Sequence, residues 1–301
     1  MHRDGEEHAL AIHVEGEDPA PWLEAFRAAF PDWRVLRSDQ IDAGAIDQVV
    51  VAVVWAPPSG FLGQFPNLKQ IFSIGAGTDH LSSDPSRPLR VPVIPRQEPA
   101  STRAMAEFVL MQVLLHHRRV GDSIMHRSAK RWEPEPRGPV AGCRISILGF
   151  GPMAQATAEL LVQFGCEVTA WSRTPKSSAI VNVRSGWSAL DAMFQHPDLL
   201  INLLPSTDET RGLIDERRLS LLPRGAGFIN VGRGDAVEQS ALLRLLDSGH
   251  LSLASLDVLR SEPPPANDPV WTHSRVILTP HVASSPIPAG YAAWVATKIS
   301  L

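Results

Sequence analysis

The stretch that decides the fold is residues 144–165, which read RISILGFGPMAQATAELLVQFG. A short apolar run is followed by a glycine-containing turn, an apolar helix and a second glycine, in the order strand, turn, helix and helix cap. Gly149 permits the sharp bend, Gly151 lets a pyrophosphate approach the backbone, and Ala154 lets helix and strand pack closely. The segment therefore predicts the first β-α unit of a dinucleotide-binding domain.

The start of this helix is expected to bind the cofactor phosphates, because a helix N-terminus presents free amides and the positive end of the helix dipole. Pro152 at the first helical position has no N–H, so Met153 and Ala154 must supply the amides. A helix start with incidental glycines is the simpler alternative. It is disfavoured because the strand, the turn and the helix all occur in the order that a dinucleotide-binding unit requires.

Strand-like runs alternate with helical segments on both sides of this stretch. Before it, the strands are expected at residues 9–14, 49–54 and 68–74, and the helices at 21–29 and 102–119. After it, strands are expected at residues 167–171, 199–204, 227–230, 252–257 and 276–278. The pattern predicts an α/β protein with two doubly wound parallel-sheet (Rossmann-like) domains and an interdomain cleft.

The chain has 301 residues, about twice the usual length of one domain. Prolines at positions 92, 95 and 99 break the pattern between the two series of strands, and residues 286–301 look like a last helix that leaves the second series. We therefore expect a substrate domain of residues 1–98 plus 286–301, and a dinucleotide-binding domain of residues 99–285.

Composition excludes several classes of protein and site. No apolar run reaches the roughly 18 residues of a membrane span, and the first residues lack the apolar core of a secretory signal, so a cytoplasmic location is expected. A balance of 28 basic and 32 acidic residues, net charge −4, gives no reason to expect nucleic acid or membrane as a partner. Cys143 and Cys166 are expected to be buried small hydrophobes, and no metal site is predicted.

The segment after the strand at 167–171 indicates which cofactor fits. A carboxylate about 20 residues beyond the glycine turn normally accepts the adenosine ribose hydroxyls of NAD. Here that place holds Ser172, which brings no negative charge, and the cations Arg173 and Lys176, which could pair with a 2′-phosphate. We expect NADP to be preferred, with NAD as the alternative. The simpler interpretation is that both cations are solvated loop charges.

Three chemically matched groups follow successive strands of the second series. Arg233, Glu262 and His281 all come at carboxyl ends of predicted strands, the edge that faces the ligand crevice in a doubly wound sheet. A guanidinium binds a carboxylate and polarises a neighbouring carbonyl, and an imidazole beside a carboxylate can deliver a proton. The set suits carbonyl reduction. Taken singly, each residue also has an ordinary explanation as a surface ion pair, a solvent-facing glutamate or a hydrogen-bonded core histidine.

Together, three motifs resemble the D-isomer-specific 2-hydroxyacid dehydrogenase family: NVGRG at 230–234, LDVLRSEPP at 256–264 and TPH at 279–281. The resemblance implies that Arg233 binds and polarises the substrate, that Glu262 is the partner carboxylate and that His281 is the general acid/base. The segment Gly75-Ala76-Gly77-Thr-Asp79 is similar to the family's substrate loop, whose successive amides would hold the substrate carboxylate. An ordinary strand-to-helix turn is the alternative for that segment.

The resemblance also implies further cofactor contacts. These are Leu204, Pro205 and Thr210 beside the adenosine half, Val231 and Gly232 in the NVGRG motif, and Asp257 near the nicotinamide carboxamide. Within the family, the WSR-x-x-K segment at 171–176 and Trp55 before two prolines resemble the glyoxylate/hydroxypyruvate reductase branch. That branch uses NADPH and small 2-keto acids, and Trp55 would cover the substrate, although a tryptophan beside a buried strand is more often core.

The leading hypothesis is therefore an NADPH-dependent reductase of a small 2-keto acid such as glyoxylate or hydroxypyruvate, acting as a homodimer. Two alternatives stay open at this point. One is an NAD-linked dehydrogenase of a larger D-2-hydroxyacid, and the other is a non-catalytic nucleotide-sensing interaction protein. The intact set of Arg233, Glu262 and His281 argues against the second alternative, since a sensor does not need all three.

Overall fold

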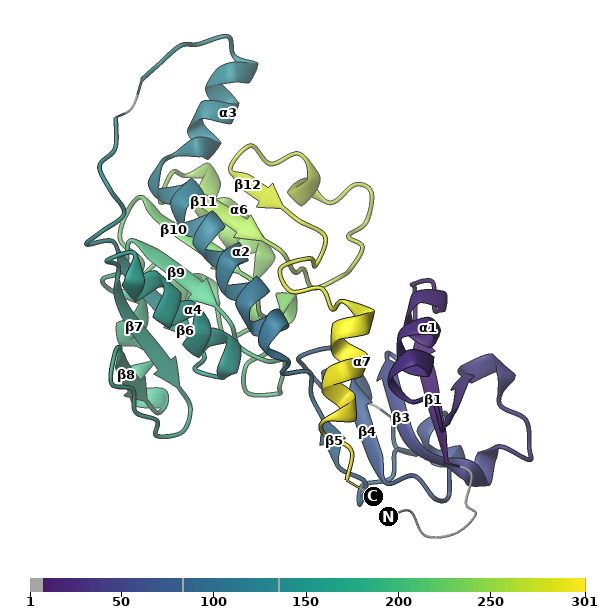
Figure 1. Cartoon of the computed structure of the whole chain (residues 1–301). Coiled ribbons are helices and arrows are strands. Elements are labelled where there is room, and N and C mark those ends of the chain that lie inside the picture. Colours follow the sequence, from purple (N-terminus) through teal and green to yellow (C-terminus); the bar gives the residue numbers. More distant parts are fainter. Residues whose placement is uncertain (1–7, 83, 135, 301) are drawn as a thin grey trace. The chain divides into compact units, whose positions relative to one another are not determined.

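The computed structural model describes residues 8–82, 84–134 and 136–300. The chain divides into two compact units: unit 1 holds the residues up to Ser101 together with those from Pro286 onward, and unit 2 holds Thr102–Ser285. Each unit contains its own all-parallel sheet with helices, as Figure 1 shows. The predicted α/β class with two doubly wound sheets is thereby confirmed.

Unit 1 is built on a five-stranded sheet in the order β2-β1-β3-β4-β5. Its strands are β1 (Ala9–Val14), β2 (Arg34–Arg37), β3 (Val49–Trp55), β4 (Gln70–Ser73) and β5 (Val93–Ile94), and its helices are α1 (Ala20–Ala29) and α7 (Pro288–Ala296). Successive residues of a strand point to opposite faces, so Leu10 and Ile12 pack with α1 and α7 while Ala9 and Ala11 pack on the other face. Both faces of β1 and β3 are covered, which explains the unbroken apolar sequence of β3.

Unit 2 is built on a seven-stranded sheet in the order β12-β11-β10-β9-β6-β7-β8. Its strands are β6 (Arg144–Leu148), β7 (Glu167–Ser172), β8 (Asn182–Ser185), β9 (Leu199–Asn202), β10 (Ala226–Asn230), β11 (Leu251–Leu256) and β12 (Val276–Leu278). The chain runs outward from β6 to β8 and then returns to place β9 on the other side of β6. The order in which strands are added to the sheet therefore reverses between β6 and β9. Ligands of such sheets bind at the carboxyl ends of the strands at this point.

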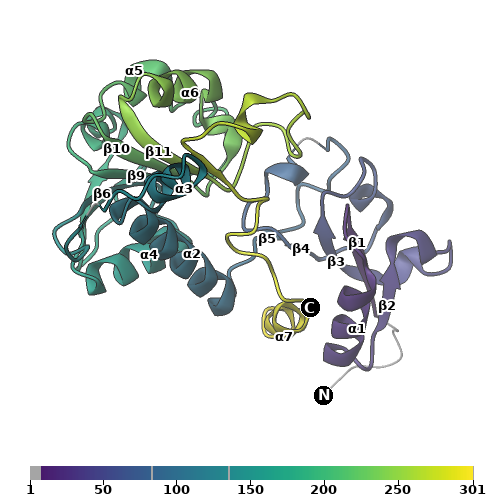
Figure 2. The ribbon, with the colours of Figure 1, turned by 90° about the horizontal axis from the view of Figure 1, so that it is seen from above.

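The helices of unit 2 cover both faces of its sheet. They are α2 (Pro99–His117, which begins in unit 1), α3 (Val120–Ser128), α4 (Pro152–Gln163), α5 (Glu216–Leu219) and α6 (Gln239–Asp247). Figure 2 shows α2 and α4 on one face and α5 and α6 on the other. Each face has its own apolar cluster, one containing Val109 and Ile147 and the other containing Phe228 and Leu242.

The predicted elements agree with the structure where the sequence is strongly apolar. The strands expected at 9–14, 144–148 and 276–278 have those bounds. The sequence did not predict three short strands, β2, β5 and β8. These strands lie at sheet edges or have polar sequences. The long helix begins at Pro99 rather than Thr102, because proline is tolerated in the first turn of a helix.

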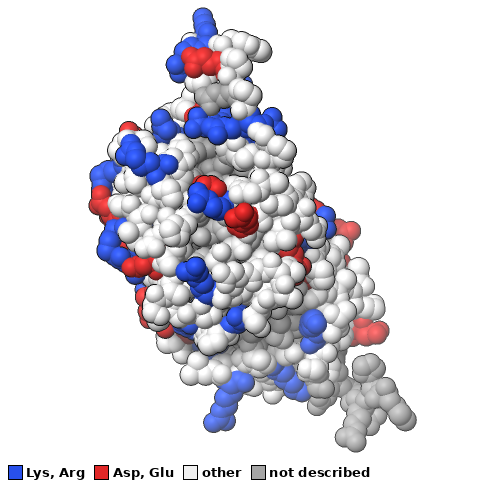
Figure 3. Space-filling model, turned by 90° about the vertical axis from the view of Figure 1, so that its left-hand side faces the viewer, with Lys and Arg blue, Asp and Glu red and all other residues white. Residues whose placement is uncertain are grey.

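Three further features bear on the predicted classes of protein. Cys143 and Cys166 are buried with free thiols, as expected of small hydrophobes, and burial raises the pKa of Cys143 to about 12. Among the described helices, none combines the length and the apolar character that crossing a bilayer requires. On the face shown in Figure 3, acidic and basic side chains are interspersed among uncharged ones.

Candidate active site

The glycine turn between β6 and α4 has the geometry that a dinucleotide requires. Gly149 has φ +101°, and a Cβ there would lie 2.9 Å from the carbonyl oxygen of Leu203, so only glycine fits. Gly151 is the N-cap of α4, and nothing lies within 4 Å of where its Cβ would be. A pyrophosphate can therefore approach the backbone there. The first helical hydrogen bond joins Gln155 N–H to Gly151, which leaves the amides of Met153 and Ala154 for an anion.

The two cations that follow β7 both donate hydrogen bonds to other groups of the chain. The Arg173 Nη1 donates to Glu209 Oε2 at 2.7 Å, and the Lys176 Nζ donates to the carbonyl oxygen of Phe150 in the glycine turn at 2.8 Å. Ser172 is buried, and its hydroxyl donates to the carbonyl of Thr174. Neither cation is simply a solvated loop charge. Their pairing with a 2′-phosphate stays a prediction.

The loop after β9 is braced by a buried threonine. Thr210 Oγ1 donates to the carbonyl of Pro205 at 2.6 Å and accepts from Thr207 N–H at 2.9 Å. At the start of the loop, the amide of Leu204 donates to the side-chain oxygen of Asn202. The residues predicted to line the adenosine half thus belong to one hydrogen-bonded loop.

A pair of buried asparagines positions the loop that carries Arg233. Asn202 Nδ2 donates to Asn230 Oδ1 at 2.9 Å, the same oxygen accepts from Gly232 N–H at 3.2 Å, and Asn230 Nδ2 donates to the Arg233 carbonyl at 3.2 Å. A Cβ at Gly232 would lie 2.8 Å from the Leu204 carbonyl oxygen, so the loops after β9 and β10 approach closely. Sequence reasoning assigned no role to Asn202 or Asn230. The available signal was an asparagine at the end of each of two apolar strands.

His281 and Glu262 form a hydrogen-bonded pair. The two atoms His281 Nδ1 and Glu262 Oε2 are 2.7 Å apart, and Glu262 Oε1 accepts from the Leu259 amide at 2.8 Å. The side chains are 40% and 38% exposed, so a small molecule can reach them. Burial raises the pKa of Glu262, but the hydrogen bonds from His281 and Leu259 and the nearby charges of His281 and Arg233 outweigh it, and the pKa is lowered. The structure therefore pairs His281 with Glu262, and the charge of Arg233 also acts on the Glu262 carboxylate.

Asp257 fixes the turn that presents His281. His281 has φ 55°, a left-handed conformation that is unusual for a residue with a side chain. Buried Asp257 accepts from the amides of Val282 and Ala283 at 3.0 and 2.9 Å and from the Thr279 hydroxyl at 2.6 Å. The carboxylate thus stabilises the strained turn. Its proposed contact with the nicotinamide carboxamide stays a prediction.

In unit 1, the loop after β4 turns its carbonyls inward. The Ser73 hydroxyl lies 2.9 Å from the carbonyl oxygen of Gly75 and 3.0 Å from that of Gly77, and the Gly75 carbonyl also accepts from Arg96 N–H. Because a trans peptide directs C=O and N–H to opposite sides, the amides of Ala76 and Thr78 face away from Ser73. Outward amides are what an anion-binding loop needs.

Trp55 packs directly on this loop. A Cβ at Gly75 would lie 2.5 Å from Trp55 Cζ3, which explains the glycine, and the rings of Trp55 and His80 are 4.7 Å apart. The indole therefore has a structural role in shaping the loop. A role as a cover over the substrate stays a prediction.

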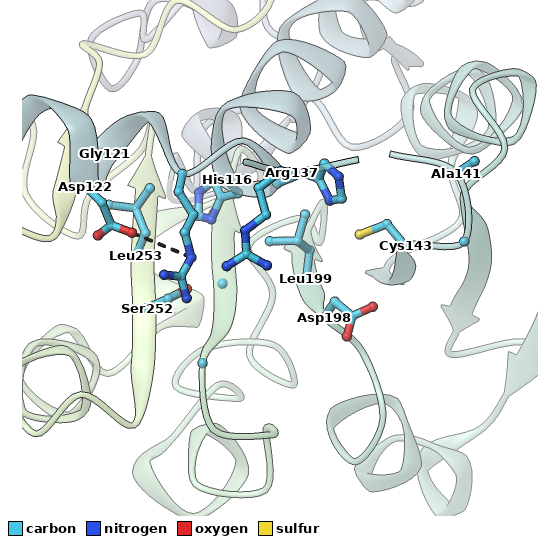
Figure 4. Close-up of a pocket in the computed structure, with 15 residues that line it drawn as sticks. His116, Gly121, Asp122, Arg137, Ala141, Cys143, Asp198, Leu199, Ser252 and Leu253 are labelled. Carbon is cyan, nitrogen blue, oxygen red and sulfur yellow. Dashed lines mark ion pairs between the residues drawn. The ribbon is translucent and has the colours of Figure 1, made fainter. Parts of the chain in front are cut away.

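A cavity of about 400 Å³ lies at the opposite, amino-terminal edge of the sheet in unit 2, between α2, α3 and the starts of β9 and β11. Figure 4 shows Arg137 directed into it, with Asp198 on the other side and His116 behind. Asp198 is ion-paired with Arg144. None of Arg233, Glu262 and His281 lines this cavity, so its volume says nothing about the predicted chemistry.

Comparison with known families and curated proteins shows what the chain is similar to. Residues 110–283 match the model of the D-isomer specific 2-hydroxyacid dehydrogenase, NAD binding domain. The chain is also 33% identical to glyoxylate/hydroxypyruvate reductase A of Yersinia enterocolitica over 272 residues, which cover 89% of this chain and 86% of that protein.

Solved structures show the same relationship. A D-isomer specific 2-hydroxyacid dehydrogenase of Xanthobacter autotrophicus Py2, in complex with NADPH and MES, is 37% identical with a TM-score of 0.91, over 97% of this chain and 93% of that one. An NADPH-dependent glyoxylate/hydroxypyruvate reductase of Sinorhizobium meliloti, in complex with NADP and sulfate, is 30% identical with a TM-score of 0.88, over 96% and 93% of the two chains.

Proposed function

Since this chain belongs to the D-isomer-specific 2-hydroxyacid dehydrogenase family, and is therefore an NAD(P)-dependent oxidoreductase, we propose that it reduces a small 2-keto acid with NADPH. Glyoxylate and hydroxypyruvate are the substrates proposed first, because both relatives named as reductases carry those names. The single observation that carries the proposal is the 2.7 Å pair of His281 and Glu262, with the charge of Arg233 acting on the same carboxylate.

In this proposal the chain's own residues bind the substrate and move its proton. Reduced nicotinamide, when bound, supplies the hydride that the keto carbon receives. Arg233 binds the substrate carboxylate and polarises the neighbouring carbonyl, and the loop of Gly75, Ala76 and Gly77 adds backbone amides to that carboxylate. His281 turns Nδ1 toward Glu262 and donates a proton from Nε2 to the carbonyl oxygen. Glu262 positions the imidazole and balances its charge.

The same proposal assigns the cofactor contacts. The pyrophosphate would bind at Gly149, Gly151 and the amides of Met153 and Ala154 at the start of α4, with Pro152 beside them. Ser172 makes room for a 2′-phosphate, which Arg173 and Lys176 would bind. Lys176 already reaches the glycine turn through the Phe150 carbonyl, which supports this assignment. The remaining proposed contacts are Leu204, Pro205, Thr210, Val231, Gly232 and Asp257.

One experiment tests the cofactor and the substrate together. The purified protein is mixed with NADPH or, separately, NADH, and loss of the reduced-nicotinamide absorbance is followed with glyoxylate, hydroxypyruvate, pyruvate and phenylpyruvate. We expect the highest kcat/KM with NADPH and one of the two smallest keto acids. Faster turnover with NADH and phenylpyruvate would instead favour an NAD-linked enzyme for larger acids. Binding of NADPH without turnover of any keto acid would favour a nucleotide sensor.

We also propose that the protein is a homodimer formed through unit 2 near α2. Met111 on α2, and Val120 and Ile124 on α3, are 49%, 40% and 47% exposed, and the C-terminal part of α3 projects away from the sheet in Figure 1. Exposed apolar side chains on two consecutive helices are typical of a surface that binds another protein. Light scattering should give twice the chain mass, and a monomer at micromolar concentration would contradict the proposal.

A further inference from the structure

The ion pair between Arg173 and Glu209 lies where the proposed cofactor would place its 2′-phosphate. Arg173 follows directly after β7, and Glu209 belongs to the loop after β9, the two segments that flank the adenosine half of a cofactor in this kind of sheet. Arg173 Nη1 and Glu209 Oε2 are 2.7 Å apart, and both side chains are about half exposed, at 52% and 53%. The pair is therefore accessible to a ligand.

Glu209 is held in this position by its own loop. Its Oε2 accepts a second hydrogen bond from the Thr207 hydroxyl at 3.2 Å, and Thr207 is tied to buried Thr210. The carboxylate therefore has a partner within its own loop as well as Arg173. A phosphate that binds Arg173 must replace this carboxylate or share the guanidinium with it.

We propose that Glu209 is a specificity-determining residue that competes with the 2′-phosphate for Arg173 and so narrows the preference for NADPH over NADH. This inference rests on the proposed cofactor site. The 2′-phosphate brings a charge of about −1.5 to −2 next to a carboxylate of the same sign, whereas NADH lacks that group and leaves the ion pair undisturbed. Lys176 is different, because its partner is the neutral carbonyl of Phe150. Of the two cations, Arg173 alone would exchange a carboxylate partner for the 2′-phosphate.

The size of the effect follows from the exposure of the pair. Exposed ion pairs are weak, so Glu209 tunes affinity rather than blocking the site, and its removal should tighten binding of 2′-phosphorylated nucleotides about two- to fivefold. The effect should shrink as salt is added, because the interaction is between solvent-exposed charges. Affinity for nucleotides without the 2′-phosphate should change less than twofold, a size expected of neutral surface changes.

The test is calorimetric titration of the full chain with NADP⁺, NAD⁺, 2′,5′-ADP and AMP. Glu209→Gln should lower the Kd values of NADP⁺ and 2′,5′-ADP and leave the Kd values of NAD⁺ and AMP unchanged. Asp208→Asn is the matched control, since it removes the same charge from the neighbouring position, where the side chain is 96% exposed and pairs with Arg211 instead. In an Arg173→Gln background, Glu209→Gln should lose most of its effect.

The outcomes separate this inference from the proposed function. If Arg173→Gln weakens NADP⁺ but Glu209→Gln does not tighten it, or if Asp208→Asn tightens it equally, Glu209 is not a competitor and the inference is overturned. If the unaltered protein binds NADP⁺ no better than NAD⁺, and Arg173→Gln changes neither, then the proposed cofactor preference fails, and this inference fails with it.

Discussion

At the scale of single residues, the predicted chemistry depends on two side chains that hold His281 in place. Its ring is fixed by Glu262 and its backbone by Asp257, which together supply one side-chain and two main-chain constraints. The backbone angle of 55° is costly for a residue with a Cβ, by about 1 to 2 kcal/mol. The structure retains the strained turn because Asp257 satisfies the amides that follow it.

Replacement of His281 tests its role as the proton donor. His281→Asn is the preferred change, because asparagine tolerates a left-handed backbone better than alanine does. We expect kcat to fall by about 10²- to 10⁴-fold, the usual contribution of a general acid. The Kd for NADPH, measured by fluorescence titration, should change little. Near-normal turnover in this variant would show that another group donates the proton.

Replacement of Asp257 tests the brace behind His281. Asp257→Asn exchanges one acceptor oxygen for an N–H, so the amide of Val282 or Ala283 loses its partner, at a cost of about 1 to 3 kcal/mol. Denaturant unfolding should show this loss, and kcat should fall with it as the turn loosens. Asp215→Ala is the control, because it removes the carboxylate that accepts from the Arg218 amide at the N-cap of α5, at a cost of about 1 kcal/mol. That variant should lose stability but keep kcat, and equal loss of kcat in both would contradict a specific role.

At the scale of elements, α2 is joined to the sheet of unit 2 by a buried polar chain. His116 Nε2 lies 2.9 Å from the Ser255 hydroxyl on β11, which in turn donates to Gln112 Oε1 at 2.8 Å. The imidazole also packs on β10, where a Cβ at Gly227 would lie 2.3 Å from its Nδ1. Burial lowers the pKa of His116 to about 4. The helix is therefore docked through a histidine that is neutral in the folded protein.

This docking predicts a pH-dependent stability. The folded pKa of His116 lies below its ordinary value of 6.5, so the unfolded chain binds the proton more readily. Stability should therefore be full above about pH 6.5 and fall as the pH drops toward 4, by at most about 3 kcal/mol. Denaturant midpoints measured across this range should fall less in His116→Gln, whereas His117→Gln on the same helix should follow the unaltered protein. An unchanged slope in His116→Gln would contradict the assignment.

At the scale of the whole molecule, unit 1 is assembled from two distant parts of the chain. The last helix, α7, contributes Tyr291, Ala292 and Val295 to the same apolar cluster as β1 and α1. The Tyr291 hydroxyl donates to the carbonyl of Ser73 at 2.7 Å, so α7 also supports the strand that leads into the glycine loop. Unit 2 is continuous in sequence between its two connections to unit 1. The two units should therefore respond separately to changes in their own cores.

Matched valine truncations test this separation. Val295→Ala in α7 and Val109→Ala in α2 both shorten fully buried side chains, one in each unit. We expect each to cost about 1 to 3 kcal/mol through lost burial and cavity formation. Hydrogen exchange should show reduced protection of β1 and β3 in the first variant and of β6 and β9 in the second. Equal loss of protection in both units from either change would show that they unfold together.

The sequence by itself determined the fold class, the glycine turn and the family. Residues 144–165 indicate the order of strand, turn and helix locally, because the turn preference of glycine and the period of the apolar residues can be read from neighbouring positions of the chain. The same holds for the buried strands 9–14 and 49–54. The strands of β2, β5 and β8 could not be predicted, because short edge strands gain their order from pairing with a neighbour rather than from their own sequence.

Only the tertiary structure decided which side chains act on one another. Arg173 and Glu209 are 36 residues apart, and Asn202 and Asn230 are 28 apart, so their pairing follows from strand order in the sheet. Sequence predicted Arg173 as a cation for a phosphate, but not that a carboxylate already holds it. The sequence shows that Asn230 begins the NVGRG motif, but not its hydrogen bonds, and it indicates Asp257 near the cofactor, but not its brace on His281. Such contacts depend on long-range packing, which the local pattern of residues does not contain.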